Sequence, residues 1–298
     1  MSTTLDNHRL DQLGSRVTGS VLAPDDAGYD AARAVHNGLV DRKPALIVRA
    51  RSVQDVVAAL AFARSGGFEV SVRGGGHNVA GRAVTDGGVM IDLAEMKDVT
   101  IDPERAIASA QGGVTWNELN EAAAVHGLAV TGGAVSTTGI AGYTLGGGLG
   151  WLMGKYGLAC DNLVAVELVT AAGDVLQVDA ESHPDLLWAL RGGGGNFGVA
   201  TSFTYRLHPL STVTGGLIAH PIDAAPALLR FYREASAACS DDLTVFAGLV
   251  HAPDGSGAKL AAMVACHAGN PADAERDSSP SRRGDRPRWC RSARSPTR

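Results

Sequence analysis

Apolar and polar residues alternate along the chain with two periods, which divide it into short strands and helices. Apolar positions recur at helical spacing over residues 53–64, and Ser52 stands three residues before Asp55, a capping-box arrangement that predicts the start of a helix. The pair Gly66-Gly67 predicts its end. Similar patterns predict strands at 45–48, 68–72, 89–93, 128–131 and 199–207, hairpins of 99–102 with 106–110 and of 164–170 with 175–178, and helices from Thr115 to Gly127 and over 183–190. Because this order lacks a regular strand–helix–strand repeat, the predicted fold class is α+β.

The pattern changes after Pro209 and again near Arg276. Three strands (213–221, 243–250, 259–266) and a helix (224–238) predict the opening of a second domain with an antiparallel sheet. We therefore expect a lead-in at 1–40, a main domain at 41–211, a partial second domain at 212–275 and a tail at 276–298.

The predicted tail has an unusual composition. Eight of its 23 residues are arginine and very few are apolar, so it cannot bury enough surface to offset its ordering entropy. It is either a disordered, solvated basic tail or the product of out-of-frame translation. The second interpretation is favoured because the tail interrupts an amphipathic pattern that begins at 271–275.

Composition narrows the class of protein. A net charge of -5 and a pI near 6.0 argue against a nucleic-acid or anionic-membrane partner. Four cysteines without CxxC spacing predict reduced thiols and no metal site. The N-terminus lacks the apolar segment of a signal peptide, and no apolar run approaches the roughly 18 residues that span a bilayer. We expect a soluble, cytoplasmic protein of undetermined oligomeric state.

Glycine is the residue that stands out, with 38 occurrences, many of them in clusters at 74–76, 142–150 and 192–198. Glycine allows backbone N–H groups to approach a ligand closely, and successive N–H groups form a concave site for a phosphate. A single cluster is more often a tight turn. Three clusters, each joined to a strand or helix end, favour a bound nucleotide.

Two common nucleotide sites do not fit the sequence. Residues 193–198 match G-x-G-x-x-G, but a predicted helix precedes them and a strand follows, the reverse of the order in a dinucleotide-binding fold. Lys155 lacks the spacing of a P-loop. Neither an NAD-binding Rossmann domain nor a P-loop is therefore predicted.

Four ordered motifs, at 72–78, 133–142, 145–150 and 185–199, resemble those of FAD-linked oxidases with the PCMH-type (vanillyl-alcohol-oxidase-like) fold. The resemblance covers roughly residues 20–275 and is strongest to the berberine-bridge-enzyme-like and 6-hydroxy-D-nicotine-oxidase-like branch. It implies that 41–211 is an FAD-binding domain of two α+β subdomains with the cofactor between them. It also implies that 212–275 is an incomplete antiparallel-sheet substrate domain.

The resemblance assigns roles to particular residues. Backbone N–H groups of the 73–78 loop would bind the FAD pyrophosphate, and His77 would be the covalent attachment site, unless it only bonds nearby backbone. A neutral imidazole is a suitable nucleophile near pH 7. Val135 replaces a cysteine found in doubly tethered relatives, so a single attachment is expected. The cofactor-binding residues implied in this way are Arg73, Gly74, Gly75, Gly76, His77, Asn78, Thr137, Thr138, Gly139, Gly142, Tyr143, Gly198 and Val199.

Some of these residues also have a purely structural interpretation. Thr137 and Thr138 could cap a helix, alone or in addition to lining the cofactor. The Tyr143 hydroxyl could bond the isoalloxazine, but packing of its ring is the favoured interpretation. Four other histidines are interpreted as ordinary surface residues: His36, His126, His183 and His208.

The implied activity is that of an oxidase, in which a small-molecule substrate passes a hydride to FAD and dioxygen then takes up the electrons. The family continues for well over a hundred residues beyond Arg276 and carries its catalytic base there, so no catalytic residue is assigned. A truncated remnant that binds flavin without turnover is the alternative.

Overall fold

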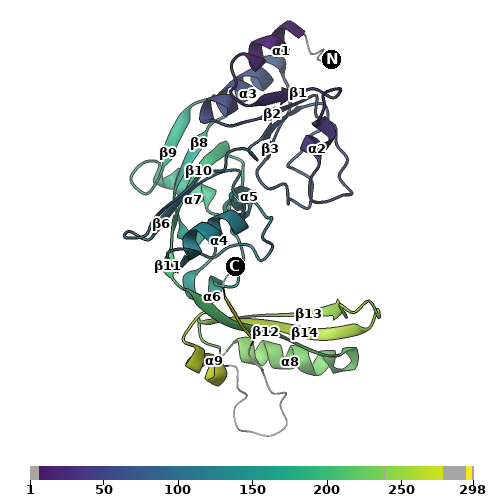
Figure 1. Cartoon of the computed structure of the whole chain (residues 1–298), viewed down its shortest axis with the longest axis vertical. Helices are drawn as coiled ribbons and strands as arrows, with labels where there is room; N and C mark the ends of the chain where they lie inside the picture. The colour runs from purple at the N-terminus through teal and green to yellow at the C-terminus, as the bar shows by residue number, and fades with distance from the viewer. Residues whose placement is uncertain (1–6, 238, 278–292, 297–298) are drawn as a thin grey trace.

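The computed structural model describes residues 7–237, 239–277 and 293–296, whose strands form three main sheets (Figure 1). Two sheets with their helices form the upper part of the molecule in Figure 1, and the third lies below them. The mixed helix and sheet content confirms the predicted α+β class. The boundaries proposed for the domains stay a prediction.

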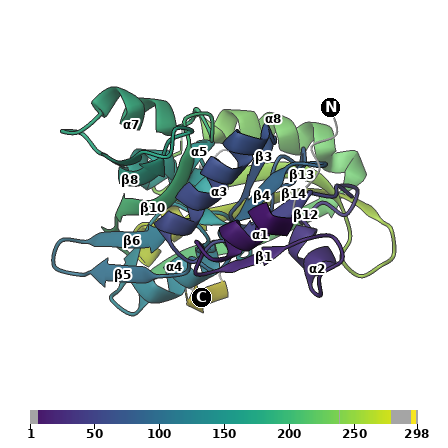
Figure 2. The same ribbon diagram turned by 90° about the horizontal axis from the view of Figure 1, so that it is seen from above.

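The first sheet has the strand order β1-β2-β4-β3. Strands β2, β4 and β3 are parallel, with α3 returning the chain from β2 to β3, and β1 pairs antiparallel with β2 at one edge. Helix α1 lies beside α3, as the view from above shows (Figure 2). The bounds are α1 Asn7–Gly14, β1 Ser20–Leu22, α2 Tyr29–Arg33, β2 Leu46–Arg49, α3 Val53–Gly66, β3 Val70–Arg73 and β4 Val89–Asp92.

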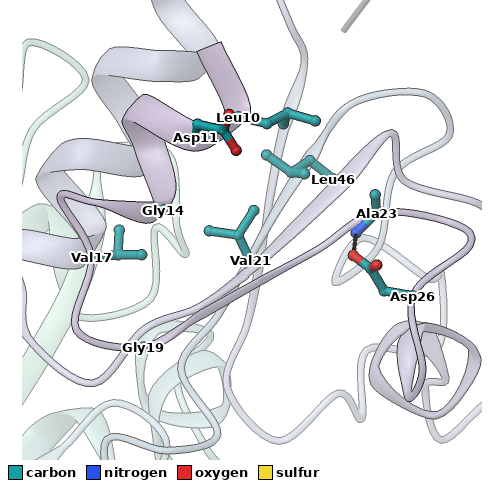
Figure 3. A pocket seen from close by; sticks show the side chains of 9 residues that line it. All are labelled: Leu10, Asp11, Gly14, Val17, Gly19, Val21, Ala23, Asp26 and Leu46. Carbon is teal, nitrogen blue, oxygen red and sulfur yellow. Dashed lines mark hydrogen bonds between the residues drawn. The ribbon is translucent and has the colours of Figure 1, made fainter. Parts of the chain in front are cut away.

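Helix α3 shows why the local sequence was sufficient to predict it. The Ser52 hydroxyl accepts a hydrogen bond from the Asp55 N–H, and Gly67 ends the helix in a left-handed conformation. One face of α3 packs with β2 and β4 in a core that includes Leu46, Val48, Val56, Ala59, Ala63, Val89 and Ile91. A shallow hollow lies between α1 and β1, lined by residues such as Leu10, Val21 and Leu46, and it shares no residue with the glycine clusters (Figure 3).

The second sheet, β5-β6-β10-β8-β9, is antiparallel throughout. Both predicted hairpins are confirmed, as β5 with β6 and as β8 with β9. The core below it contains the fully buried Trp116, Phe203 and Tyr205. The bounds are β5 Val99–Asp102, β6 Ile107–Gln111, α4 Trp116–Ala124, β7 Leu128–Ala129, α5 Ile140–Leu145, α6 Met153–Tyr156, η1 Cys160–Asn162, β8 Leu163–Val169, β9 Val175–Val178, α7 Pro184–Leu190, β10 Val199–Arg206 and β11 His208–Pro209.

The third sheet, β13-β14-β12-β15, is also antiparallel, and α8 covers one of its faces (Figure 1). The predicted strands and helix of this region are confirmed to within two residues. The bounds are β12 Thr212–Pro221, η2 Ile222–Ala224, α8 Ala225–Ser236, β13 Leu243–His251, β14 Lys259–His267, α9 Pro271–Asp277 and β15 Ala293–Pro296. In the part of the chain that is described, no helix has both the length and the apolarity to cross a bilayer.

Part of the predicted tail has regular structure. Helix α9 extends to Asp277, and Ala293–Pro296 pairs with β12 as strand β15. Backbone hydrogen bonds to an exposed strand edge need no apolar side chains, so composition alone does not exclude such pairing. The rest of the predicted tail, 278–292 and 297–298, lies outside the described residues.

Two differences from the predicted elements concern helix ends and short helices. Helix α4 ends at Ala124 rather than at the predicted Gly127, because residues 125–127 form a turn outside the helix. Helix α5 lies inside the glycine-rich region, where none was predicted. Its six residues are too few to show helical periodicity.

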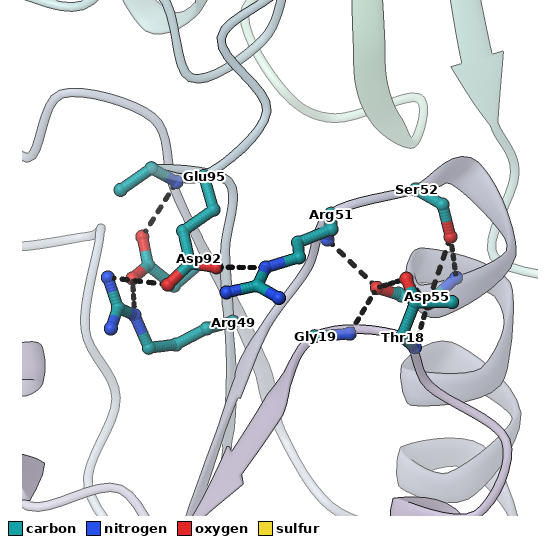
Figure 4. Close-up of polar contacts among 9 residues, drawn as sticks. Thr18, Gly19, Arg49, Arg51, Ser52, Asp55, Asp92 and Glu95 are labelled. Atoms are coloured by element: carbon teal, nitrogen blue, oxygen red, sulfur yellow. Dashed lines mark hydrogen bonds and ion pairs between the residues drawn. The ribbon is translucent and has the colours of Figure 1, made fainter.

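A buried carboxylate, that of Asp55, joins α3 to the chain before β1 (Figure 4). It accepts hydrogen bonds from the Thr18, Gly19 and Arg51 N–H groups at 2.9, 3.0 and 2.8 Å, and from the Thr18 and Ser52 hydroxyls. Burial raises the pKa of Asp55, but the bonds from Arg51, Thr18 and Ser52 outweigh it and hold the pKa below its ordinary value.

Asp55→Asn is expected to lower the free energy of unfolding by about 2–3 kcal/mol, because an amide cannot accept all of these bonds. A carboxyl whose pKa is depressed in the folded state stabilises above its unfolded pKa of about 3.9 and loses that contribution as the pH falls through the folded value. The difference in the free energy of unfolding between wild type and variant, measured in urea, should therefore become smaller at acid pH. The exposed Asp25→Asn serves as control; a difference that is independent of pH would contradict this role for Asp55.

Candidate functional site

Two glycine loops lie with their backbones in direct contact. A Cβ placed on Gly75 would lie 2.2 Å from the Gly139 nitrogen, and one on Gly139 would lie 2.3 Å from the Gly75 nitrogen. The first loop follows β3 of the first sheet and the second precedes α5. Only residues without a side chain allow this approach. It brings together two motifs that the sequence placed far apart.

The loop after β3 presents a run of free backbone donors. The N–H groups of the five residues from Gly74 to Asn78 make no hydrogen bond to any residue that the structure describes. Gly76 is buried with φ of 71°, and Gly74, Gly75 and His77 are half-buried. Since N–H groups removed from water need an acceptor, this loop is suited to an anionic ligand such as a phosphate.

The same loop also meets the start of β10. A Cβ on Gly74 would lie 2.9 Å from the Gly112 carbonyl oxygen, and one on Gly112 would lie 2.6 Å from that of Ala200. Gly198 approaches β8 closely, because its Cβ would lie 2.4 Å from the Val169 oxygen. The Val199 side chain is buried in the core, so it would contribute to a ligand site only through its backbone. Gly112 joins these segments, and no motif in the sequence identified it.

His77 lies where the two glycine loops meet. Its Nε2 is 3.1 Å from the Thr137 hydroxyl and its Nδ1 is 3.4 Å from the Thr138 hydroxyl. The ring also stacks on His36, with centroids 4.0 Å apart and planes 15° from parallel. The imidazole is therefore held by side chains from two other segments.

Helix capping does not explain the two threonines. The residue that caps α5 is Gly139, which makes no side-chain cap bond, whereas Thr137 and Thr138 bond to His77. Burial lowers the pKa of His77, and a charge on the neighbouring His36 lowers it further. The imidazole is thus mostly neutral at pH 7.

The Arg73 side chain points back into the protein, whereas the exposed Asn78 side chain bonds the turn that follows it. Arg73 makes two bonds to the fully buried Asp92, at 2.9 and 2.6 Å, and one to the Ala34 oxygen at 2.9 Å. The Asn78 side-chain oxygen accepts the N–H groups of Ala80 and Arg82. Both residues fix the two ends of the loop, and the Arg73 guanidinium is bonded within the protein.

Asp92, the partner of Arg73, also belongs to a group of ion pairs with Arg49 and Glu95 (Figure 4). Arg49 lies 3.5 Å from Asp92 and 2.9 Å from Glu95, and Glu95 also pairs with Arg51. Among the described residues, no group of three or more metal-binding side chains is present.

Tyr143 packs against the core from α5, in agreement with the favoured interpretation. Its ring meets Trp116 edge to face, with centroids 5.6 Å apart. Burial raises the pKa of its hydroxyl. Gly142, the preceding residue, is exposed and would have room for a side chain.

The other glycines of the clusters serve packing and turns. A Cβ on Gly148 would lie 2.5 Å from that of Ala159, and one on Gly150 would lie 2.3 Å from the Gly132 oxygen. The N–H groups of Gly192 and Gly194 both donate to the Leu145 oxygen at the end of α5. These contacts give the four residues a role in packing within the protein.

Two histidines have partners that the sequence interpretation missed. His36 is exposed but forms the stack on His77. The interpretation of His208 as an ordinary surface residue is wrong, since its Nε2 lies 2.7 Å from the buried Asn162 oxygen and its ring stacks on Tyr156. Neither contact follows from local sequence.

Comparison with known proteins gives a consistent result. A family model described as an FAD binding domain matches residues 44–179. The (R)-6-hydroxynicotine oxidase of Paenarthrobacter nicotinovorans is 42% identical over 194 residues, which make up 65% of this chain and 42% of that protein. The FAD-linked oxidoreductase pgmH of Aspergillus terreus is 37% identical over 209 residues, 69% of this chain and 42% of that protein.

Solved structures extend the similarity to the third sheet. The 6-hydroxy-D-nicotine oxidase from Arthrobacter nicotinovorans aligns with a TM-score of 0.82 and 36% identity, over 88% of this chain and 58% of that one. The BBE-like 1 protein of Physcomitrella patens aligns with a TM-score of 0.83 and 25% identity, over 90% and 58%. The chain spans less than half the length of the curated relatives named above.

Gly75→Ala is expected to lower the free energy of unfolding by about 2–4 kcal/mol, because its Cβ would overlap backbone rather than a movable side chain. Gly142→Ala is the matched control in the neighbouring helix, where the added methyl has room. It should be neutral or stabilising by up to about 1 kcal/mol. Both values come from urea unfolding; equal effects of the two substitutions would contradict the contact at Gly75.

Proposed function

We propose, from the similarity of this chain to FAD-linked oxidoreductases, that its loop from Gly74 to Asn78 holds the FAD pyrophosphate and that His77 tethers the flavin covalently. Family and cofactor agree with the prediction from the four glycine-bearing motifs. The roles of the individual residues and the tether are the proposal.

The observation that carries the proposal is the run of five unpaired N–H groups in the described structure. A pyrophosphate offers several anionic oxygens, which would satisfy these donors in a half-buried place that excludes much of the water. The contacts of Gly75 with Gly139 and of Gly74 with Gly112 keep the donors in position without any side chain in the way.

His77 has the properties of an attachment site. Its imidazole is held in place by Thr137 and Thr138, and burial favours the neutral, nucleophilic form. Val135 is half exposed in the loop that carries Thr137 and Thr138, and its side chain has no group that could form a second covalent bond to the flavin. A single tether through one ring nitrogen of His77 follows.

FAD, when bound, supplies the capacity to accept a hydride from a small organic substrate and to return the electrons to dioxygen. The relatives named as 6-hydroxynicotine oxidases support a small organic substrate and an oxidase. The part of this chain is to bind the phosphates, hold the flavin by His77 and orient it between the first two sheets.

Flavin binding without turnover is the second candidate. It is favoured by the surroundings of His77, where His36 is the one titratable side chain among its described contacts. Peroxide production with a panel of alcohols, amines and sugars separates the candidates: an oxidase forms peroxide with at least one of them, and a binding protein with none.

His77→Ala is expected to abolish covalent flavin while leaving folding intact, because the side chain is half-buried at the surface end of the loop. Wild-type protein should keep its yellow colour after acid precipitation, and the variant should release it into the supernatant. The control is His126→Ala, an exposed histidine after α4. Colour that stays with the His77→Ala polypeptide would refute the tether.

The rate of covalent attachment should depend on pH through His77. Since the pKa of this residue lies below the ordinary histidine value of about 6.5, attachment to added FAD should be fast and constant above that pH and fall only below it. In His36→Ala the fall should move to higher pH, because removing the neighbouring charge raises the pKa of His77. Acid-stable flavin absorbance against time at each pH measures both; a profile rising only above pH of about 8 would contradict a nucleophilic imidazole.

A further inference from the structure

The third sheet has one covered face and one open face. Val245, Ala247, Ala261 and Met263 pack against α8 on the covered face. Successive residues of a strand point to opposite sides, so the neighbours of these residues lie on the other face. In Figure 1 that face is turned toward the FAD-binding domain, and α8 lies on the far side.

An apolar row crosses the open face. Strand register places Phe246 opposite Val264 and Val264 opposite Leu217, so the three side chains lie side by side on β13, β14 and β12. Phe246 remains 36% exposed and Leu217 63% exposed. The row therefore presents large apolar surface that the described residues do not cover.

The rest of the open face is uncharged and includes small residues as well as Val250 and Leu260. Next to the row, Gly248 pairs with Ala262, and Ala262 pairs with Ala219. Among the residues of β12, β13 and β14 that point to this side, none is Asp, Glu, Lys, Arg or His. Ala262 is buried, so Gly248 and Ala219 form the accessible part of a small, uncharged platform beside an aromatic ring.

Trp151 connects this face to the FAD-binding domain. Its ring meets Phe246 edge to face, with centroids 5.0 Å apart and planes at 70°. Lys155 then fixes α6 to the end of the sheet through Asp242 at 2.8 Å and the Ala268 oxygen at 2.9 Å. The open face is thus held next to the segment that leads from Tyr143 to Trp151.

We propose that the open face, with Trp151, Phe246 and Leu217, binds the planar aromatic part of the substrate and selects against sugars. This inference rests on the proposed function, since it assigns the substrate side of the same flavin site. An aromatic ring gains edge-to-face contact with Trp151 or Phe246 and covers the Gly–Ala platform. Sugar hydroxyls buried here would lose water without gaining charged or amide partners, which disfavours them.

The test uses the full chain with FAD, whose uptake is first checked by flavin absorbance. Equilibrium dialysis then measures binding of 2-naphthol, a planar uncharged aromatic, and of cellobiose, an uncharged sugar. Saturable binding of 2-naphthol, a shift of the flavin absorption on its addition and no binding of cellobiose are expected.

Leu217→Glu is expected to weaken 2-naphthol binding by about tenfold or more, because it puts a carboxylate into the apolar row. Leu249→Glu is the matched control. Leu249 is 60% exposed on β13, but it points to the face that α8 covers, because it pairs with Ala261. Phe246→Leu, which keeps apolar volume and removes the ring, should also weaken binding. Circular dichroism verifies that each variant is folded.

Three results would overturn the proposal. They are an equal loss of 2-naphthol binding in the two glutamate variants, binding of cellobiose instead of 2-naphthol, and a Leu217→Glu variant that changes only in its association state. The two levels of the hypothesis remain distinguishable. Protein that takes up FAD but not 2-naphthol refutes the aromatic face alone. Protein that binds 2-naphthol in this variant pattern but never takes up FAD refutes the flavin function and leaves the aromatic face supported.

Discussion

A contact between two stretches of bare backbone, at Gly75 and Gly139, is the constraint on which the rest of the site depends. A single carbon on either residue would lie within 2.3 Å of the other's nitrogen. The contact joins the loop after β3 to the loop before α5, and so joins the first sheet to the second. It sets His77 beside Thr137 and Thr138 and leaves the N–H groups of its own loop without an acceptor among the described residues. Packing that excludes side chains thus leaves the backbone donors on which the proposed phosphate site rests.

Charged groups behind the loop hold it in this arrangement. Asp92 is fully buried and is bonded twice by Arg73, which also reaches the Ala34 oxygen. A buried carboxylate is costly without such partners, so the pair is a strong geometric requirement rather than a large net source of stability. Its consequence is a rigid end of β3, from which the free N–H groups project. The Arg73 side chain thus stabilises the loop from within the protein, and at Arg73 a ligand would contact only backbone.

The proposed cofactor side and the proposed substrate side of the molecule have different chemistry. Around His77 the surface offers backbone donors, two hydroxyls and a mostly neutral imidazole, which suit phosphates and attachment of a flavin. Across Trp151, the open face of the third sheet offers apolar and small side chains without charge. Lys155 and Asp242 tie the two parts together. A cofactor held by polar backbone and a substrate held by apolar side chains would meet between them.

The sequence by itself determined the elements whose signals are local and the motifs that name the family. Helix α3 has its cap, its periodicity and its terminal glycine between Ser52 and Gly67, and both hairpins of the second sheet have adjacent strands. Tertiary structure alone decided what each glycine contacts, because a Cβ on Gly75 would meet the backbone of Gly139 and one on Gly148 would meet the side chains of Ala159 and Tyr143. It also decided that His36 stacks on His77, that Arg73 turns inward to Asp92, and that the charge-free face of the third sheet adjoins Trp151. These contacts join residues far apart in the chain, and periodicity or capping within a short segment carries no information about such pairings.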